Sequence, residues 1–451
     1  MDILNQIPVV GSPILTILAF VVALSVIITV HEYGHYIVGR WSGIHPEVFS
    51  LGFGPTLLSR VDKRGTEWRL SAIPLGGYVK FLGDADAASA GKDEGFLDHL
   101  VHEEREKELR RSMMGAPLWA RAATVAAGPI FNFVFGGLVF AAFYLVVGAA
   151  VEPPTIGTMT PLPPGVENPL RPGDRIVAIE GRETPDYDAF YSVLDDVPVQ
   201  PSVDYTIERD GSQQVVTGPW PFPIVISTVH PNSAASDAGL RIGDAIVSVN
   251  GAPLTAFREL QTITKDTGGA PLDLRVWRDG ETLDINLTPR LTDLPNNEGG
   301  FDQRWLIGLN GGLLFEPATD STDLGTALKN GALSVYGIMS QSLSALYHVA
   351  TRSISECALR GAIGIAEAAG DMASQGVGPF IRFIAVLSVA VGLINLFPIP
   401  ILDGGHLVFH AYEAVTRRPP SERALNLLMT VGLVIVVAFM SFALINDFRC
   451  P

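Results

Sequence analysis

The chain has 451 residues, of which 47% are hydrophobic and only 17% are charged. Soluble domains usually carry about 25% charged residues, so this composition excludes a disordered chain or a coiled coil and favours a membrane protein. The formal net charge of −16 argues against a nucleic-acid-binding protein, and two cysteines, Cys357 and Cys450, cannot supply a disulfide framework or a cysteine-based metal site.

Four uncharged stretches are long enough to cross a bilayer as helices, because a hydrocarbon core of ~30 Å needs about 20 helical residues. They are Ile14 to Val30, Ala122 to Val151, Phe383 to Leu402 and Ala424 to Asn446. No Lys or Arg precedes the first stretch and no small-residue cleavage site follows it, so we expect a retained helix rather than a signal peptide.

Basic residues near the ends of these stretches predict the orientation of the chain. They cluster in the loops after the first and third stretches, so both loops are expected in the cytoplasm and both termini outside it. The cluster residues are Arg40, Arg110, Arg111, Arg121, Arg417, Arg418 and Arg423. Residues 326–350 mix apolar and polar positions, which predicts an amphipathic helix at the outer face rather than a fifth span.

An acidic block with an internal repeat lies between the second and third stretches. From Ala149 to Gly325 there are 26 acidic and 11 basic residues. Residues 170–181 recur as residues 240–251 with seven of twelve positions identical, and each copy predicts a Gly-Asp turn, a short strand and a Gly turn. A duplicated β-rich domain of any kind fits this pattern, but the segment from Pro231 to Leu240 resembles the permuted PDZ domains of bacterial proteases.

A candidate metal site follows the first uncharged stretch. His31-Glu32-Tyr33-Gly34-His35 is a His-Glu-x-x-His motif, in which positions i and i+4 share one helix face, so both imidazoles can reach one metal ion. Glu32 can then act as a general base toward a water molecule. The alternative is a helix end at which polar residues merely meet water, but ionisable residues at membrane depth are costly and usually functional.

Zinc usually takes three protein ligands, so a third must come from another span. Asp403 is the best candidate because it ends the third stretch, which runs from the outside inward and reaches the level of His35. His406 and His410 are rivals, but we expect them in a polar loop beyond Gly404-Gly405. His45 is an unfavoured candidate for the same reason.

These residues carry a resemblance to a known family. The chain resembles the site-2 protease family of intramembrane zinc metalloproteases over essentially its whole length. The matching motifs are His31-Glu32-x-x-His35, Asn395-x-x-Pro398-x-Pro400-x-Leu402-Asp403-Gly404, Ala127-Gly128-Pro129-x-x-Asn132, Gly52-Phe53-Gly54-Pro55 and Asn446-Asp447-Phe448.

The resemblance implies a zinc-dependent protease of the bacterial inner membrane. Its expected substrates are single-pass membrane proteins already cleaved on the outer side, such as membrane-anchored anti-sigma factors and remnant signal peptides, in regulated intramembrane proteolysis. Asn395, Pro398 and Pro400 are expected to hold the unwound substrate. The segment from Trp68 to Val79, with Gly76, Gly77 and Tyr78, is expected to form a β-hairpin that pairs with the substrate by edge addition. The PDZ pair is expected to bind peptide ends and to act as a size filter.

The expected fold is a core of four transmembrane helices with two β-rich PDZ domains inserted between the second and third helices. The expected segments are a first transmembrane helix (1–40), a cytoplasmic loop with the membrane-associated hairpin (41–117), a second transmembrane helix (118–150), a first PDZ domain (151–221), a second PDZ domain (222–292), an outer-face linker with amphipathic helices (293–379), a third transmembrane segment (380–403), a cytoplasmic loop (404–423) and a fourth transmembrane helix (424–447).

Two other functions fit parts of the sequence. A non-catalytic membrane PDZ receptor would not depend on the His-Glu-x-x-His motif. A metal transporter would need polar residues along several spans, whereas the second and fourth stretches carry almost none besides Asn132 and Asn426.

Overall fold

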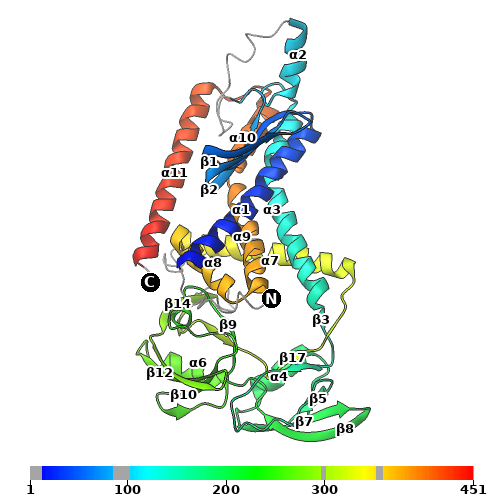
Figure 1. Cartoon of the computed structure of the whole chain (residues 1–451), viewed down its shortest axis with the longest axis vertical. Helices are drawn as coiled ribbons and strands as arrows, with labels where there is room; N and C mark the ends of the chain where they lie inside the picture. The colour runs from blue at the N-terminus through cyan, green and yellow to red at the C-terminus, as the bar shows by residue number, and fades with distance from the viewer. Residues whose placement is uncertain (1–12, 85–101, 296–300, 352–358, 450–451) are drawn as a thin grey trace. The chain divides into compact units, whose positions relative to one another are not determined.

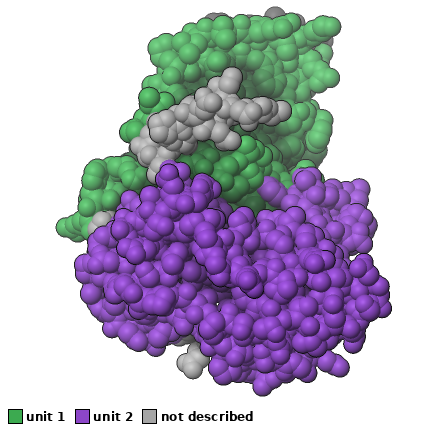
Figure 2. All heavy atoms as spheres, turned by 60° about the horizontal axis from the view of Figure 1, so that its bottom comes forward, with its two compact units in different colours: residues 1–141, 328–347, 359–451 green, residues 142–327, 348–358 purple. Residues whose placement is uncertain are grey.

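The computed structural model describes residues 13–84, 102–295, 301–351 and 359–449. The chain forms two compact units, coloured separately in Figure 2. Unit 1 comprises residues 1–141, 328–347 and 359–451, and unit 2 comprises residues 142–327 and 348–358. Cys357, Cys450 and most of the charged stretch 85–108 lie outside the described residues.

The helices and strands are numbered in chain order, and Figure 1 labels many of them. The helices are α1 (Pro13–Trp41), α2 (His102–Arg111), α3 (Leu118–Val147), α4 (Tyr187–Asp196), α5 (Ala234–Asp237), α6 (Phe257–Asp266), α7 (Leu324–Ala350), α8 (Ala362–Ser374), α9 (Val377–Asn395), α10 (Asp403–Thr416) and α11 (Glu422–Arg449). The strands are β1 (Pro46–Val61), β2 (Glu67–Phe81), β3 (Ala149–Ala150), β4 (Ile156–Met159), β5 (Arg175–Ile179), β6 (Arg182–Glu183), β7 (Ser202–Arg209), β8 (Ser212–Pro219), β9 (Ile226–Val229), β10 (Ala245–Val249), β11 (Ala252–Pro253), β12 (Leu272–Arg278), β13 (Glu281–Leu287), β14 (Arg290–Pro295), β15 (Phe301–Leu306), β16 (Leu309–Gly311), β17 (Phe315–Pro317) and β18 (Thr319–Asp320).

Four helices, α1, α3, α9 and α11, are long and apolar enough to span a membrane. They overlap the four uncharged stretches of the sequence, and much of their apolar surface is exposed, as expected for side chains that face lipid. The chain is therefore a membrane protein with a helical core and β-rich regions.

Glycines allow the helices of unit 1 to approach closely. A Cβ atom added at Gly34 of α1 would meet the Ala127 carbonyl of α3, and one added at Gly392 of α9 would lie 3.0 Å from the Pro129 carbonyl of α3. Contacts of this kind need residues without side chains, because dispersion forces between lipid-embedded helices depend on close backbone approach. They bring α1 and α9 onto the same section of α3.

The β1–β2 sheet packs against the C-terminal part of α1. Its core contains Tyr36 of α1, Phe49 of β1 and Val79 of β2. Residues 48–51 of β1 pair with residues 77–80 at the end of β2. The same four residues also pair with residues 67–70 at the start of β2, so each half of β2 forms its own ladder with β1.

The turn of this hairpin differs from the prediction. The segment from Trp68 to Val79 belongs to one strand, and the chain reverses between Val61 and Glu67. Asp62 fixes that turn, because its Oδ1 accepts hydrogen bonds from the backbone N–H groups of Arg64 and Thr66. The Asp-x-x-Gly turn chemistry outweighs the Gly76-Gly77 pair, which stays within the strand.

Unit 2 contains two four-stranded sheets with the same order of elements, β6-β5-β7-β8 and β11-β10-β12-β13. The sequence repeat places an Asp at the same turn in each sheet. Asp174 and Asp244 are each 1% exposed and each binds an Arg of the neighbouring long strand, Arg209 or Arg278, through both carboxylate oxygens. The recurring Leu-Arg-x-Gly-Asp motif therefore stabilises each sheet with a buried, bidentate ion pair.

The second of these domains interrupts the chain of the first. β16 pairs with β9 and completes the second domain, whereas β17 pairs with β4 and β18 pairs with β3, both in the first domain. Residues 301–320, which were expected in a linker, thus form strands. The prediction placed the boundary at 292, because short strands that pair across about 80 residues or more leave no local signal in the sequence.

The third span and the segment after it also differ from the predicted boundaries. α9 ends at Asn395, because Pro398 and Pro400 cannot continue a helix. Asp403 does not end that span but begins α10, which occupies the region expected to be a loop. Gly404 and Gly405 permit this turn, since a Cβ on either would meet backbone atoms of residues 396–400.

Candidate metal centre

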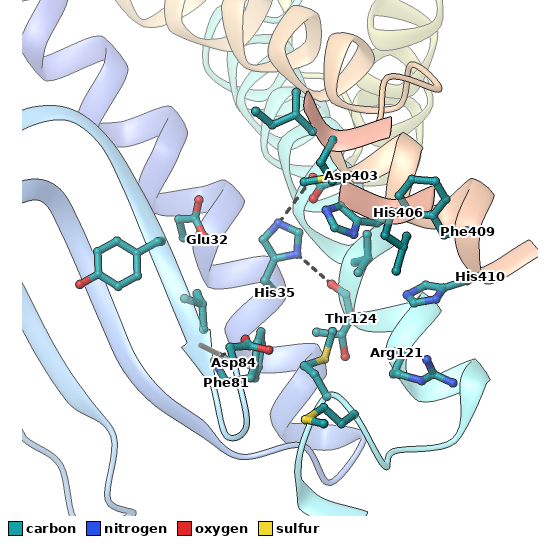
Figure 3. A pocket seen from close by; sticks show the side chains of 18 of the residues that line it. Glu32, His35, Phe81, Asp84, Arg121, Thr124, Asp403, His406, Phe409 and His410 are labelled. Carbon is teal, nitrogen blue, oxygen red and sulfur yellow. Dashed lines mark hydrogen bonds and ion pairs between the residues drawn. The ribbon is translucent and has the colours of Figure 1, made fainter. Parts of the chain in front are cut away.

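Three side chains from two distant parts of the chain converge within unit 1. His31, His35 and Asp403 each offer one ligand atom, and these atoms all lie within 4.8 Å of one another. Nε2 of His31 is 3.2 Å from Nε2 of His35 and 3.1 Å from Oδ2 of Asp403. Figure 3 shows Asp403 of α10 facing His35 of α1. The geometry thus brings together the three residues predicted as metal ligands.

The local structure explains why these atoms meet. His31 and His35 are one helical turn apart, and their rings meet nearly perpendicularly, with an interplanar angle of 82°. A side chain at Gly128 of α3 would overlap both imidazoles. The Ala127-Gly128-Pro129 motif therefore leaves the space in which the two rings lie.

The second nitrogen of each imidazole contacts α3. Nδ1 of His35 lies 2.8 Å from the carbonyl oxygen of Thr124. A carbonyl can only accept a hydrogen bond, so Nδ1 carries a proton, and in the neutral imidazole Nε2 then has a lone pair for a metal ion. Nδ1 of His31 lies 3.2 Å from the amide of Asn132, which is completely buried.

These residues fit a zinc ion. The Nε2, Nε2 and carboxylate oxygen set is a common zinc donor set that leaves a fourth position for water or substrate. Oδ2 of Asp403 lies 3.1 Å from Nε2 of His31 and 3.5 Å from Nε2 of His35, so all three atoms can reach one metal ion.

The three candidate ligands line a cavity of about 390 Å³. Glu32, Gly77 and Tyr78 also line it. The backbone N–H of Val79 in β2 donates a hydrogen bond to the Glu32 carboxylate, which holds this carboxylate between the sheet edge and the metal ligands. Residues 77–80 of β2 pair with residues 48–51 of β1, and Gly77, Tyr78 and Val79 also line the cavity.

Comparisons with known proteins agree with this geometry. The family model of Peptidase family M50 matches residues 19–439. The regulator of sigma-E protease RseP of Salmonella typhimurium is 35% identical over 461 residues, covering 95% of this chain and 97% of that protein. RseP of Escherichia coli is 34% identical over 462 residues, with the same two coverages. A protein of Agrobacterium fabrum, named provisionally as a zinc metalloprotease, is 33% identical over 440 residues, covering 96% of this chain and 95% of that protein.

The chain belongs to peptidase family M50. This M50 protein is a zinc metalloprotease of the site-2 type, and zinc is its cofactor. The resemblance to the site-2 protease family is confirmed. Membership of the family favours catalysis over the receptor and transporter alternatives.

Of the residues predicted to contact substrate in this M50 protein, those of β2 lie at the cavity and those at or after the end of α9 do not line its described part. Gly77 and Tyr78 line the cavity, and Gly76 lies next to them in β2. Pro398 is exposed and Pro400 is half-buried. The side-chain amide of Asn395 donates a hydrogen bond to the Val391 carbonyl one turn back in α9. Asn395, Pro398 and Pro400 do not contribute to the described lining of the cavity.

Two histidines that the sequence analysis placed in a polar loop lie on α10 and line the same cavity. His406 and His410 occupy positions i and i+4 of α10, as Figure 3 shows. Nε2 of His410 is buried without a hydrogen-bond partner. Burial, with the nearby Arg121 guanidinium as a smaller cause, lowers the pKa of His410 to about 4. The i, i+4 spacing could have revealed this shared face, had the segment been recognised as a helix.

An ion pair also joins α3 to α10 beside the cavity. The guanidinium of Arg121 donates hydrogen bonds to both carboxylate oxygens of Glu413, at 3.1 and 2.7 Å. Both side chains are mostly buried. This bidentate pair fixes the far end of α10, whose first residue is Asp403, and the sequence alone did not indicate that these two residues meet.

Proposed function

We propose that this M50 protein hydrolyses peptide bonds within the transmembrane segments of single-pass membrane proteins already cleaved on their outer side. The observation that carries this proposal is the position of the candidate ligands. His31 and His35 lie on α1, an apolar helix long enough to span a membrane, and they face a cavity bordered by a strand edge. A substrate at this cavity can therefore come from the bilayer.

The edge of β2 is proposed to bind the substrate. A peptide bond within a helix is protected by its own hydrogen bonds, and in lipid no water replaces them, so the helix must unwind before hydrolysis. An open strand edge offers replacement hydrogen bonds to the unwound chain. Gly76, Gly77 and Tyr78 lie on this strand, and Asn395, Pro398 and Pro400 are proposed to hold the unwound segment from the side of α9.

Glu32 is proposed as the catalytic general base. When bound by His31, His35 and Asp403, zinc supplies Lewis-acid chemistry that polarises a carbonyl group and acidifies water. Glu32 takes the proton of the attacking water and passes it to the nitrogen of the departing amine. The hydrogen bond from the Val79 N–H orients the Glu32 carboxylate for both transfers.

The two domains of unit 2 are proposed to be tandem PDZ domains. They would admit to the active site only substrates with a small outer domain, and they would bind peptide ends. Support comes from the repeated Gly-Asp turns, from the shared strand order and from α5, a short helix whose N-cap Ser233 begins the Ser-Ala-Ala segment. Anti-sigma-factor-like proteins and remnant signal peptides are the proposed substrates, in regulated intramembrane proteolysis. The names of the RseP relatives support this class.

The proposed location is the bacterial inner membrane, with unit 2 and both termini in the periplasm and the metal ligands near the cytoplasmic side. The excess of Arg residues in the segments between α1 and α3 and between α10 and α11 supports this orientation.

The proposed function is tested by co-expression with a single-span membrane protein, supplied with or without its outer domain. We predict cleavage of the truncated substrate by the parental protein and none by Glu32→Gln, because an amide cannot accept the proton. Zinc content should be equal in the two purified proteins, since Glu32 is not among the three ligands.

Cleavage by Glu32→Gln at the parental rate would contradict the role of Glu32. Equal cleavage of the intact and truncated substrates by the parental protein would contradict the requirement for prior processing. A soluble protein carrying the same cleavage sequence is the control for hydrolysis within the membrane.

A further inference from the structure

Asn132 of α3 is a completely buried polar residue to which the proposed mechanism assigns no role. Its side-chain Nδ2 lies 3.2 Å from Nδ1 of His31, and its Oδ1 is buried without a hydrogen-bond partner. A buried amide oxygen without a partner is destabilising and therefore points to a function.

The chemistry of imidazole decides which atom of the amide should face His31. If Nε2 of a neutral His31 binds a metal ion, the ring proton must be on Nδ1. Nδ1–H needs an acceptor, and the NH₂ group of Asn132 cannot be one. A half-turn of the amide about its terminal torsion places Oδ1 toward Nδ1 at nearly the same distance, because the two ends of an amide have similar shapes.

The same turn removes the unpartnered oxygen, since Oδ1 then accepts the hydrogen bond of Nδ1–H. His35 already has the corresponding arrangement with the carbonyl oxygen of Thr124, at 2.8 Å. Both acceptors belong to α3 and lie two helical turns apart, so this one helix can orient both imidazoles.

We propose that Asn132 is a positioning residue for the metal centre, which accepts a hydrogen bond from Nδ1–H of His31 and thereby keeps Nε2 free to bind zinc. The inference rests on His31 as a metal ligand, which is part of the proposed function. If Asn132 only filled space, any side chain of similar volume could replace it. The proposed role instead requires a hydrogen-bond acceptor at position 132.

Two substitutions separate these possibilities in the full-length protein purified in detergent. Asn132→Asp keeps an acceptor and cannot donate, whereas Asn132→Leu keeps the volume and loses both functions. We expect Asn132→Asp to bind zinc about as tightly as the parental protein and Asn132→Leu to bind it roughly 10- to 100-fold more weakly, the usual effect of losing a partner of a metal-bound His. The measurement is competitive titration of zinc against a chelator.

Ser388→Ala is the matched control. The Ser388 hydroxyl donates a hydrogen bond of 3.2 Å to the backbone carbonyl of Asn132, so this variant disturbs the same contact between α3 and α9 without changing the side chain that faces His31. Its zinc affinity should equal that of the parental protein. Equal losses of affinity in Asn132→Asp and Asn132→Leu, or parental affinity in Asn132→Leu, would overturn the inference.

A measurement on the parental protein covers the case in which a variant does not fold. In zinc-loaded protein with ¹⁵N-labelled histidine, the His31 resonances should show a protonated Nδ1, and a protonated Nε2 would overturn the inference. His31→Ala separates this result from the proposed function. If His31→Ala keeps its zinc, the proposed ligand set fails, whereas loss of zinc in His31→Ala with full retention in Asn132→Leu rejects only the role of Asn132.

Discussion

At the scale of single residues, the space around the imidazoles is as important as the ligands themselves. Gly128→Ala should displace His35 and His31, because the added methyl group would overlap both rings. We predict a strong loss of zinc and of proteolysis, measured by metal analysis and by the co-expression assay. Gly137→Ala in the same helix is the control, since its nearest neighbour would lie 3.6 Å away, at ordinary contact distance. A Gly128→Ala protein with full zinc content would contradict the proposal that Gly128 provides the space for the two imidazoles.

His410 should make the protein sensitive to acid. Its pKa is lowered to about 4 by burial, whereas an unfolded chain has a His pKa of about 6.5. Between these values the unfolded state binds a proton that the folded state does not, so the free energy of unfolding falls as the pH drops below 6.5. We predict that His410→Phe loses less thermal stability between pH 7 and pH 5 than the parental protein.

The sequence predicted the three candidate metal ligands, which the structure brings together, because each has a strong local motif. His31 and His35 share a helix face, and Asp403 follows an uncharged span that ends at the matching depth. The contacts that orient them could not be predicted in the same way. The Thr124 carbonyl is a backbone group, and a side chain such as Asn132 shows its partner only once α3 lies against α1.

At the scale of elements, the proposed binding of substrate depends on the contact between β2 and α1. A Cβ at Gly77 would lie 2.8 Å from Ile28 Cγ2 and 2.9 Å from the Ser50 carbonyl. Gly77→Val should therefore push the strand away from Glu32. We predict a large loss of proteolysis with zinc content retained, because none of the metal ligands lies on β2.

The control for this variant is Leu70→Ser, a change at an exposed position of the same strand, which should keep its activity. If Gly77→Val cleaves the truncated substrate normally, the edge of β2 does not bind the substrate as proposed.

The apolar helices were predictable as elements because their composition alone identifies them. Boundaries at prolines and glycines were less predictable. Pro398 and Pro400 indicated a break after the third span, but the following Gly404-Gly405 pair indicated a loop, whereas close packing against residues 396–400 makes these glycines part of α10. Tertiary packing outweighs local propensity at this point.

At the scale of the whole molecule, each domain of unit 2 depends on its own buried ion pair. Arg278→Met would leave Asp244, which is 1% exposed, without its bidentate partner. Breaking a buried pair in this way usually costs about 3–5 kcal/mol. We predict rapid proteolytic cleavage within residues 221–312 and an unchanged zinc content, because the metal ligands belong to unit 1.

Arg275→Met provides the comparison within the same strand. Arg275 and its partner Asp284 have side chains 59% and 78% exposed, so loss of that pair should cost less than about 1 kcal/mol. Equal proteolytic resistance of the Arg278→Met and parental proteins would show that the buried pair does not determine the stability of the second domain.

The insertion of one β-domain into the other has a consequence for synthesis on the ribosome. β4 is made early but finds its partner β17 only after the whole intervening domain, from β9 to β16, has emerged. The first domain therefore keeps an unpaired strand edge at β4 until the second domain has been synthesised. Because the backbone N–H of Leu314 donates a hydrogen bond to the carbonyl of Pro221, entry and exit of the inserted segment are adjacent, and folding of the inner domain delivers the missing strand to its place.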